Sequence, residues 1–75
     1  MTSARTFRYE LRVLGHLDER HSPWLHGFNF RYDMIQDEPI TVLSGVLPDL
    51  SALYGLLNKL SSLNLHLIEL HELSP

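Results

Sequence analysis

The sequence contains no cysteine, a single tryptophan and only six basic residues among its 75. The lack of cysteine excludes disulfide scaffolds, thiolate metal sites and thiol chemistry, so we do not expect a secreted miniprotein. Nine acidic residues give a formal net charge of -3, which argues against nucleic acid or an anionic membrane as a main partner. No apolar run approaches the ~20 residues of a membrane span, and no signal peptide is evident. We therefore expect a cytoplasmic chain.

The remaining composition is that of a folded chain. Hydrophobic residues make up 44% and charged residues 20% of the sequence, which excludes disorder driven by low hydrophobicity and high charge. A chain of this length has room for one core. We expect residues 1–75 to form a single small α+β domain, with frayed ends at 1–5 and 74–75.

Three segments carry the pattern of β-strands. Apolar and polar residues alternate from Phe7 to Val13 and again from Phe28 to Met34, as they do in strands with one buried face. The run from Ile40 to Ser44 is rich in β-branched residues. Because a short turn separates the last two segments, we expect them to form an antiparallel hairpin.

The pattern then changes to that of a helix. Asp49 can cap its start and Asn64 its left-handed end. Apolar residues follow at spacings of three and four, namely Leu50, Leu53, Tyr54, Leu57, Leu60 and Leu63. We expect Leu53 and Leu57 to face the sheet, and we expect Gly55 to mark a close approach of the helix to its neighbour.

The segment from Leu65 to Leu73 reads as a last strand with two apolar faces. In a regular strand Leu65 and Leu67 face one way, and the opposite face carries His66, Ile68 and Leu70. One helix in so short a chain cannot cover both faces. The segment therefore predicts a homo-oligomer, most simply a dimer, with His66, Ile68 and Leu70 in its interface.

Together these elements predict an α+β fold of two layers, in which one long helix lies on one face of a four-stranded, mostly antiparallel sheet. The order is strand, short helix, strand, strand, helix, strand, with the short helix at Ser22 to Gly27, where Pro23 and Gly27 mark its ends. Either the first three strands form a meander, or the sheet has a degenerate ferredoxin-like order. We favour the meander, because the connection from His16 to Gly27 is short for a parallel crossover.

Several short motifs run along most of the chain: Tyr9-Glu10, Gly15-His16, Trp24, Thr41 to Gly45, Asp49, and Ala52 to Leu57. On these motifs the chain resembles a family of small uncharacterised bacterial proteins, over about Arg8 to Leu70. It departs from that pattern before Ser22, where the family often has a second tryptophan and this chain has His21, and at Leu25, where an aromatic residue is expected. The resemblance implies a fold and a soluble bacterial origin, and no activity or site residue.

The five histidines are the most visible enrichment. His16, His21 and His26 recur every five residues, which matches neither the helical nor the strand spacing that would direct ligands at one metal. His66 and His71 differ in parity, although Glu69 and His71 share a face. We therefore expect no metal and no cofactor. The candidate ligand or partner contacts are Trp24, His16, His21 and His26, with Trp24 at the lip of a pocket.

The leading hypothesis is a small non-enzymatic interaction or ligand-sensing module that acts as a homo-oligomer, with another protein as a further candidate partner. The alternative is a small enzyme or metal-binding protein that uses the His16–His26 loop, where Asp18 or Glu19 could act as a base and His21 as an acid. No nucleophile elbow, phosphate-binding glycine loop or metal motif supports the alternative, and we assign no catalytic residue.

Overall fold

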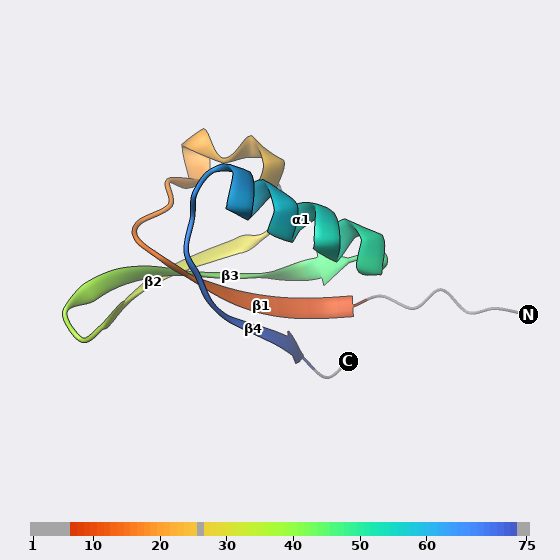
Figure 1. The fold of residues 1–75 in the computed structure, drawn as a ribbon. Coiled ribbons are helices and arrows are strands. Elements are labelled where there is room, and N and C mark those ends of the chain that lie inside the picture. Colours follow the sequence, from red (N-terminus) through yellow and green to blue (C-terminus); the bar gives the residue numbers. More distant parts are fainter. Residues whose placement is uncertain (1–6, 26, 74–75) are drawn as a thin grey trace, which may run out of the picture.

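The computed structural model describes residues 7–25 and 27–73, without the side chain of His21. The predicted frayed ends and His26 lie outside this part of the chain. In order, the elements are β1 (Phe7–Leu14), the 3-10 turns η1 (Glu19–His21) and η2 (Pro23–Leu25), β2 (Asn29–Ile35), β3 (Glu38–Leu47), α1 (Leu50–Ser62) and β4 (Leu67–Leu73). The helix and both turns lie on the same side of the sheet (Figure 1), which confirms the predicted two-layer α+β fold.

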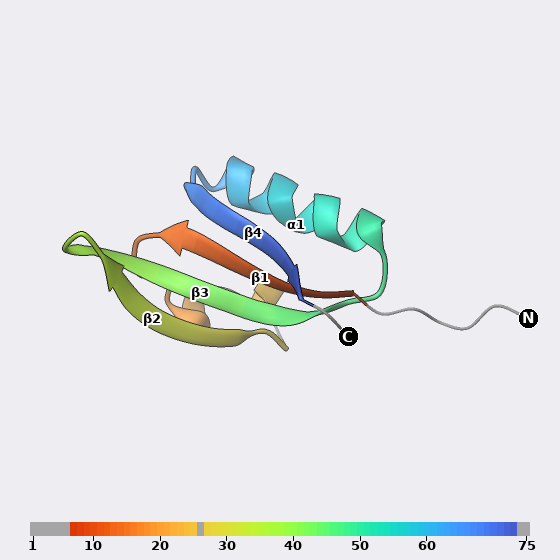
Figure 2. The ribbon, with the colours of Figure 1, turned by 90° about the horizontal axis from the view of Figure 1, so that it is seen from below.

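The strands form one antiparallel sheet in the order β2-β3-β1-β4 (Figure 2). Because β3 lies between β1 and β2, our preference for a meander was wrong, and the order is the split-βαβ arrangement of ferredoxin-like domains. A crossover needs roughly a dozen residues, and residues 15–28 are enough to carry β2 past the position of β3. The two turns occupy the place of the first helix.

The hairpin between β2 and β3 is confirmed, and it is longer than predicted. Gln36 and Asp37 have φ angles of 50° and 66°, so that both central residues of the turn adopt the left-handed conformation of a type I′ turn. Ile35 pairs with Glu38 directly beside the turn, and β3 continues to Leu47. This turn sets the register between β2 and β3.

The caps of α1 are as predicted. The Asp49 carboxylate accepts a hydrogen bond from the Ala52 N–H at 2.8 Å, and Asn64 has a φ angle of 59°. Asp49 thus satisfies a backbone N–H that the start of a helix leaves without an intrahelical partner. Asn64, in the left-handed conformation, turns the chain out of the helix. The helix therefore begins and ends where its cap residues stand.

The core lies between α1, η2 and the two central strands. Leu11 of β1 and Leu43 of β3 are fully buried, and Leu25 brings η2 into the same cluster. The helix contributes Leu53, Leu56 and Leu60. Leu53 was predicted correctly and Leu56 was missed, whereas Leu57 is only half-buried at the margin of the core. Leu25 and Leu56 thus belong to one buried cluster with the central strands.

Candidate functional site

The outer strand β4 contains a bulge that changes which side chains share a face. Leu67 lies opposite Val13 and Leu70 lies opposite Leu11, with Ile68 as the extra residue. Cross-strand partners point to the same face of a sheet, and Leu11 and Val13 face the helix. The prediction that Leu67 and Leu70 face opposite ways is therefore wrong, because a bulge inserts one residue into the alternation.

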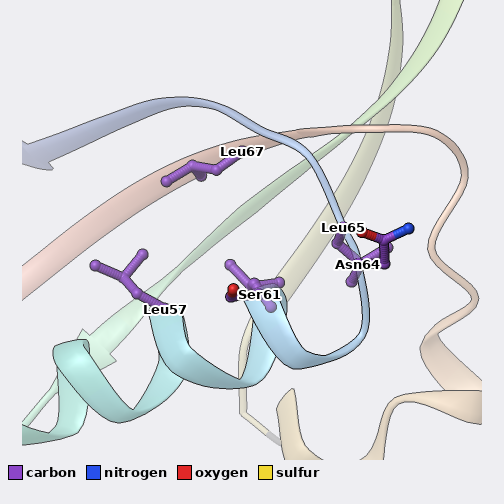
Figure 3. Close-up of a pocket in the computed structure, with 6 residues that line it drawn as sticks. Leu57, Ser61, Asn64, Leu65 and Leu67 are labelled. Carbon is purple, nitrogen blue, oxygen red and sulfur yellow. The ribbon is translucent and has the colours of Figure 1, made fainter.

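Apolar side chains are exposed where β4 lies beside α1. Ile68 and Leu70 are 38% and 37% exposed. Leu57 projects from α1 toward the strand that carries Leu67, and both line a hollow of about 310 Å³ (Figure 3). The exposed Leu50 and Tyr54 share the helical stripe of Leu57. We call this region the β4–α1 surface, composed of Leu50, Tyr54, Leu57, Leu67, Ile68 and Leu70.

Of the three predicted interface residues, His66 differs from Ile68 and Leu70. It precedes β4, its side chain is exposed, and its carbonyl accepts a hydrogen bond from the Leu14 N–H at 2.9 Å. His66 thus ties the start of β4 to the end of β1 through its backbone. Its imidazole is available to solvent at the end of the β4–α1 surface.

The face of the sheet away from α1 carries a cluster of charged side chains. The Arg12 guanidinium nitrogens lie 3.6 Å from a carboxylate oxygen of Glu10 and 3.6 Å from one of Glu69. The His71 Nε2 lies 3.5 Å from the other carboxylate oxygen of Glu69. On the same face, Arg12 and Arg31 flank Val42 from the two neighbouring strands, and Val42 is only 2% exposed. Long arginine side chains can cover apolar surface with their aliphatic stems. Val46 on this face is nevertheless 50% exposed, and Met34 on β2 is 58% exposed, so exposed apolar side chains are not confined to the β4 edge.

The predicted histidine loop is anchored to β2 and β3. The His16 ring stacks on Tyr32 at a centroid distance of 4.1 Å, and the Tyr32 hydroxyl donates to the Leu17 carbonyl at 2.8 Å. The buried Thr41 hydroxyl accepts from the Leu17 N–H at 2.9 Å and donates to the Gly15 carbonyl at 2.7 Å. These bonds fix the start of the loop, and His16 has a structural neighbour in Tyr32.

The other loop residues do not join His16. Trp24 of η2 lies against α1 and not against Tyr32. His21 lies in η1 with its side chain outside the described part of the chain, as is all of His26. Within residues 7–25 and 27–73, no group of three or more histidines and acidic residues is placed to hold a metal ion.

Trp24 does line a hollow, as predicted for a pocket lip. This hollow has a volume of about 330 Å³ and lies between η2 and α1. Its lining consists of Trp24, Phe28, Leu47, Ala52, Gly55, Leu56 and Lys59. We call it the Trp24 groove. Gly55 does not mark a close approach as predicted, since a Cβ there would meet nothing within 4 Å. Sequence reasoning missed Lys59, although its position four residues after Gly55 places both on one side of a helix.

A family model described as "Domain of unknown function (DUF8691)" matches residues 8–71. The chain belongs to this family, which agrees with the resemblance over Arg8 to Leu70 to small uncharacterised proteins. No curated protein and no solved structure matches the chain. Among the described residues, no helix has the length and apolar character needed to cross a membrane.

Proposed function

We propose that this member of the family is a small non-enzymatic interaction module that acts as a homodimer through the β4–α1 surface. One observation carries the proposal. Leu70 is 37% exposed on an edge strand, although its cross-strand partner Leu11 is fully buried. An edge strand with exposed apolar residues is a template for pairing with another chain, and a second copy would complete the burial of Leu70.

The composition of β4 favours pairing over protection. Between Leu67 and Leu73 the strand has no proline or lysine, the residues that commonly block edge pairing. The bulge at Ile68 lies near its start, so the segment from Glu69 onward keeps a regular register. This regular segment is where a second strand would add to the sheet.

The charges of β4 select one antiparallel register. If two copies pair about a twofold axis at Leu70, each Glu69 lies opposite His71 of the second copy. A register centred on Glu69 would place like charges opposite each other, which is destabilising. A register centred on His71 would place Leu70 opposite Glu72, whereas the Leu70-centred register places only the bulged Ile68 there. The Leu70-centred register therefore combines apolar contact at its centre with two favourable pairs of Glu69 and His71.

The same twofold axis brings the helices together. An axis perpendicular to the sheet leaves both copies of α1 on one face, beside the joined β4 strands. The exposed stripe of Leu50 and Tyr54 then lies next to its own symmetry mate, as expected of an isologous interface. The dimer would thus cover apolar residues of both the strand and the helix.

The proposal extends to a bacterial cytoplasmic setting. The resemblance over Arg8 to Leu70 supports the bacterial origin, and the lack of any cysteine fits a compartment in which disulfides are rare. Expression from the native promoter with a small epitope tag, followed by cell fractionation, would test the setting. Recovery in the periplasm or the medium would contradict it.

Single cysteine variants test the interface and its register, because the natural chain has no cysteine. Residues directly opposite each other in an antiparallel pair have Cα atoms about 4.5 to 5.5 Å apart, within disulfide range. We expect Leu70→Cys to form a disulfide-linked dimer quickly under mild oxidation. The matched control is Met34→Cys on β2, at the opposite edge of the sheet, and it should remain monomeric on a denaturing gel.

The position of the crosslink separates the possible outcomes. Faster crosslinking of His71→Cys than of Leu70→Cys would contradict the Leu70-centred register. Efficient crosslinking of Met34→Cys alone would place the contact at β2 and overturn the interface itself. Equal and slow oxidation of all three variants would show that no specific dimer forms.

A further inference from the structure

The Trp24 groove lies on the flank of α1 away from the β4–α1 surface. Ala52, Gly55 and Lys59 form its helical side, whereas Leu57 faces β4. Trp24 and Phe28 form its other side. The groove therefore remains open in the proposed dimer, and any role it has is separate from dimerisation.

The size of the groove fits a small molecule. Its volume of about 330 Å³ falls within the range of roughly 300 to 1,000 Å³ typical of small-molecule sites. Trp24 and Phe28 are both half-buried against the core, so their rings are held while one side of each remains accessible. Held aromatic rings favour stacking with another aromatic ring.

Gly55 gives a second, independent indication. A glycine within a helix is destabilising by about 0.5 to 1 kcal/mol relative to alanine. Its packing does not explain it, since a Cβ at this position would meet nothing within 4 Å. Gly55 lies at the wall shared by the Trp24 groove and an adjoining hollow lined also by Asn58, Lys59 and Ser62. Gly55 thus presents no side chain where the two hollows adjoin.

Lys59 supplies the charge. It is the only lysine of the sequence, it lines both hollows, and it forms no ion pair with another described residue. Among the described residues, no carboxylate lines either hollow. The helix C-terminus nearby carries a partial charge of about −0.5, which the full positive charge of the Lys59 ammonium exceeds. The polar end of the groove therefore favours an anion.

We propose that the Trp24 groove binds a small aromatic carboxylate. The ring of the ligand lies between Trp24 and Phe28 over the apolar floor of Leu47 and Leu56. Its carboxylate reaches past Gly55 to the Lys59 ammonium, with Asn58 and Ser62 as polar neighbours. A neutral ligand of the same shape would bury the same ring and lose the ion pair.

The test uses the full chain and two probes that differ only in charge, 1-naphthylacetate and 1-naphthylacetamide. The chain has one tryptophan, so the single indole N–H resonance in a nitrogen-proton correlation spectrum reports on Trp24 directly. We expect naphthylacetate to shift this resonance together with the Gly55 amide. The amide probe should bind about five- to tenfold more weakly, because an ion pair at about 4 Å in a partly solvated site is worth a small multiple of thermal energy.

Variants locate the two halves of the site. Lys59→Gln should reduce binding of naphthylacetate to that of naphthylacetamide, whereas Arg31→Gln, which removes the same charge from the open face of the sheet, should leave it unchanged. Gly55→Leu should fill the junction and abolish binding. Ser61→Leu, which adds the same bulk to the other flank of α1, should preserve it.

Three results would overturn the proposal. They are equal affinity for both probes, shifts confined to residues of the β4–α1 surface, and no shift of the Trp24 indole at millimolar probe. Sedimentation of the same samples keeps this test separate from the proposed dimer, because loss of probe binding in Gly55→Leu should leave the oligomeric state unchanged.

Discussion

The ring of Phe28, the residue before β2, lies over Gly45 of β3, so closely that a Cβ at Gly45 would come within 2.9 Å of the ring. Gly45 sits in β3 between Leu43 and Leu47, whose side chains face α1. An aromatic ring over a strand glycine protects the backbone there and helps to hold the register. The same contact places Phe28 at the wall of the Trp24 groove.

This contact predicts opposite effects for two glycine substitutions. Gly45→Ala should destabilise the protein by about 1 to 3 kcal/mol, because Phe28 must move to make room. Gly55→Ala should stabilise it by about 0.5 to 1 kcal/mol, because the helix gains propensity and the new Cβ meets nothing. Urea denaturation of both variants measures the two free energies of unfolding. A stable Gly45→Ala variant would show that Phe28 is not held over the strand.

The Thr41 hydroxyl predicts a cost for its removal. Thr41→Val should cost about 1 to 3 kcal/mol, because it leaves the Leu17 N–H and the Gly15 carbonyl without their buried partner. Thr41→Ser keeps the hydroxyl and serves as the control. A higher melting temperature for Thr41→Val than for Thr41→Ser would contradict the role of this hydroxyl as the anchor of the loop.

Leu53 and Leu57, both predicted to lie in the core, should differ in how much their replacement by alanine lowers the free energy of unfolding. Leu53→Ala should cost about 2 to 5 kcal/mol through lost burial and a residual cavity. Leu57→Ala should cost less than about 2 kcal/mol, because its side chain is already half in solvent and little cavity forms. Chemical denaturation of the monomer, in a background that abolishes dimerisation, is the measurement. Equal losses would place Leu57 in the core after all.

The cap of α1 gives a prediction with a built-in control. Asp49→Ala should cost about 1 kcal/mol, since the Ala52 N–H loses its acceptor, while Asp49→Asn should cost little because asparagine caps equally well. Helix content by circular dichroism and the midpoint in urea report both. Identical behaviour of the two variants would mean that the cap does not stabilise the helix start.

Local pattern explains how much of this fold was predictable. Alternation from Phe7 to Val13 and the helical spacing after Asp49 each depend on a periodicity that the backbone imposes, and both elements form where predicted. The order of the strands depends on which strand edges pair with each other. Alternation shows which residues of a strand share a face, but it does not show which strand lies beside it. The 3-10 turns around Trp24 lead the chain to β2 on the far side of β3. No periodicity in the sequence predicts this path.

The misassigned positions have separate physical causes. The bulge at Ile68 reverses the parity of every later residue of β4, and a bulge has no sequence signal when no glycine marks it. The prediction that Gly55 marks a close approach is wrong because this glycine lies at an open surface, where a Cβ would meet nothing within 4 Å. Trp24 was predicted at a pocket lip because it adjoins an interruption of the pattern, and it lines a hollow. Lys59 joins the same hollow only because η2 and α1 lie side by side, which the sequence pattern does not show.

Sedimentation equilibrium of the unmodified protein at micromolar concentration tests the central claim most directly. The account predicts a reversible dimer with about twice the chain mass of 8.7 kDa. It also predicts a folded monomer for Leu70→Glu, since a carboxylate in the interface would lie unpaired against its symmetry mate. The matched Met34→Glu variant should remain dimeric. A clean monomer of the unmodified chain across this range would contradict the account.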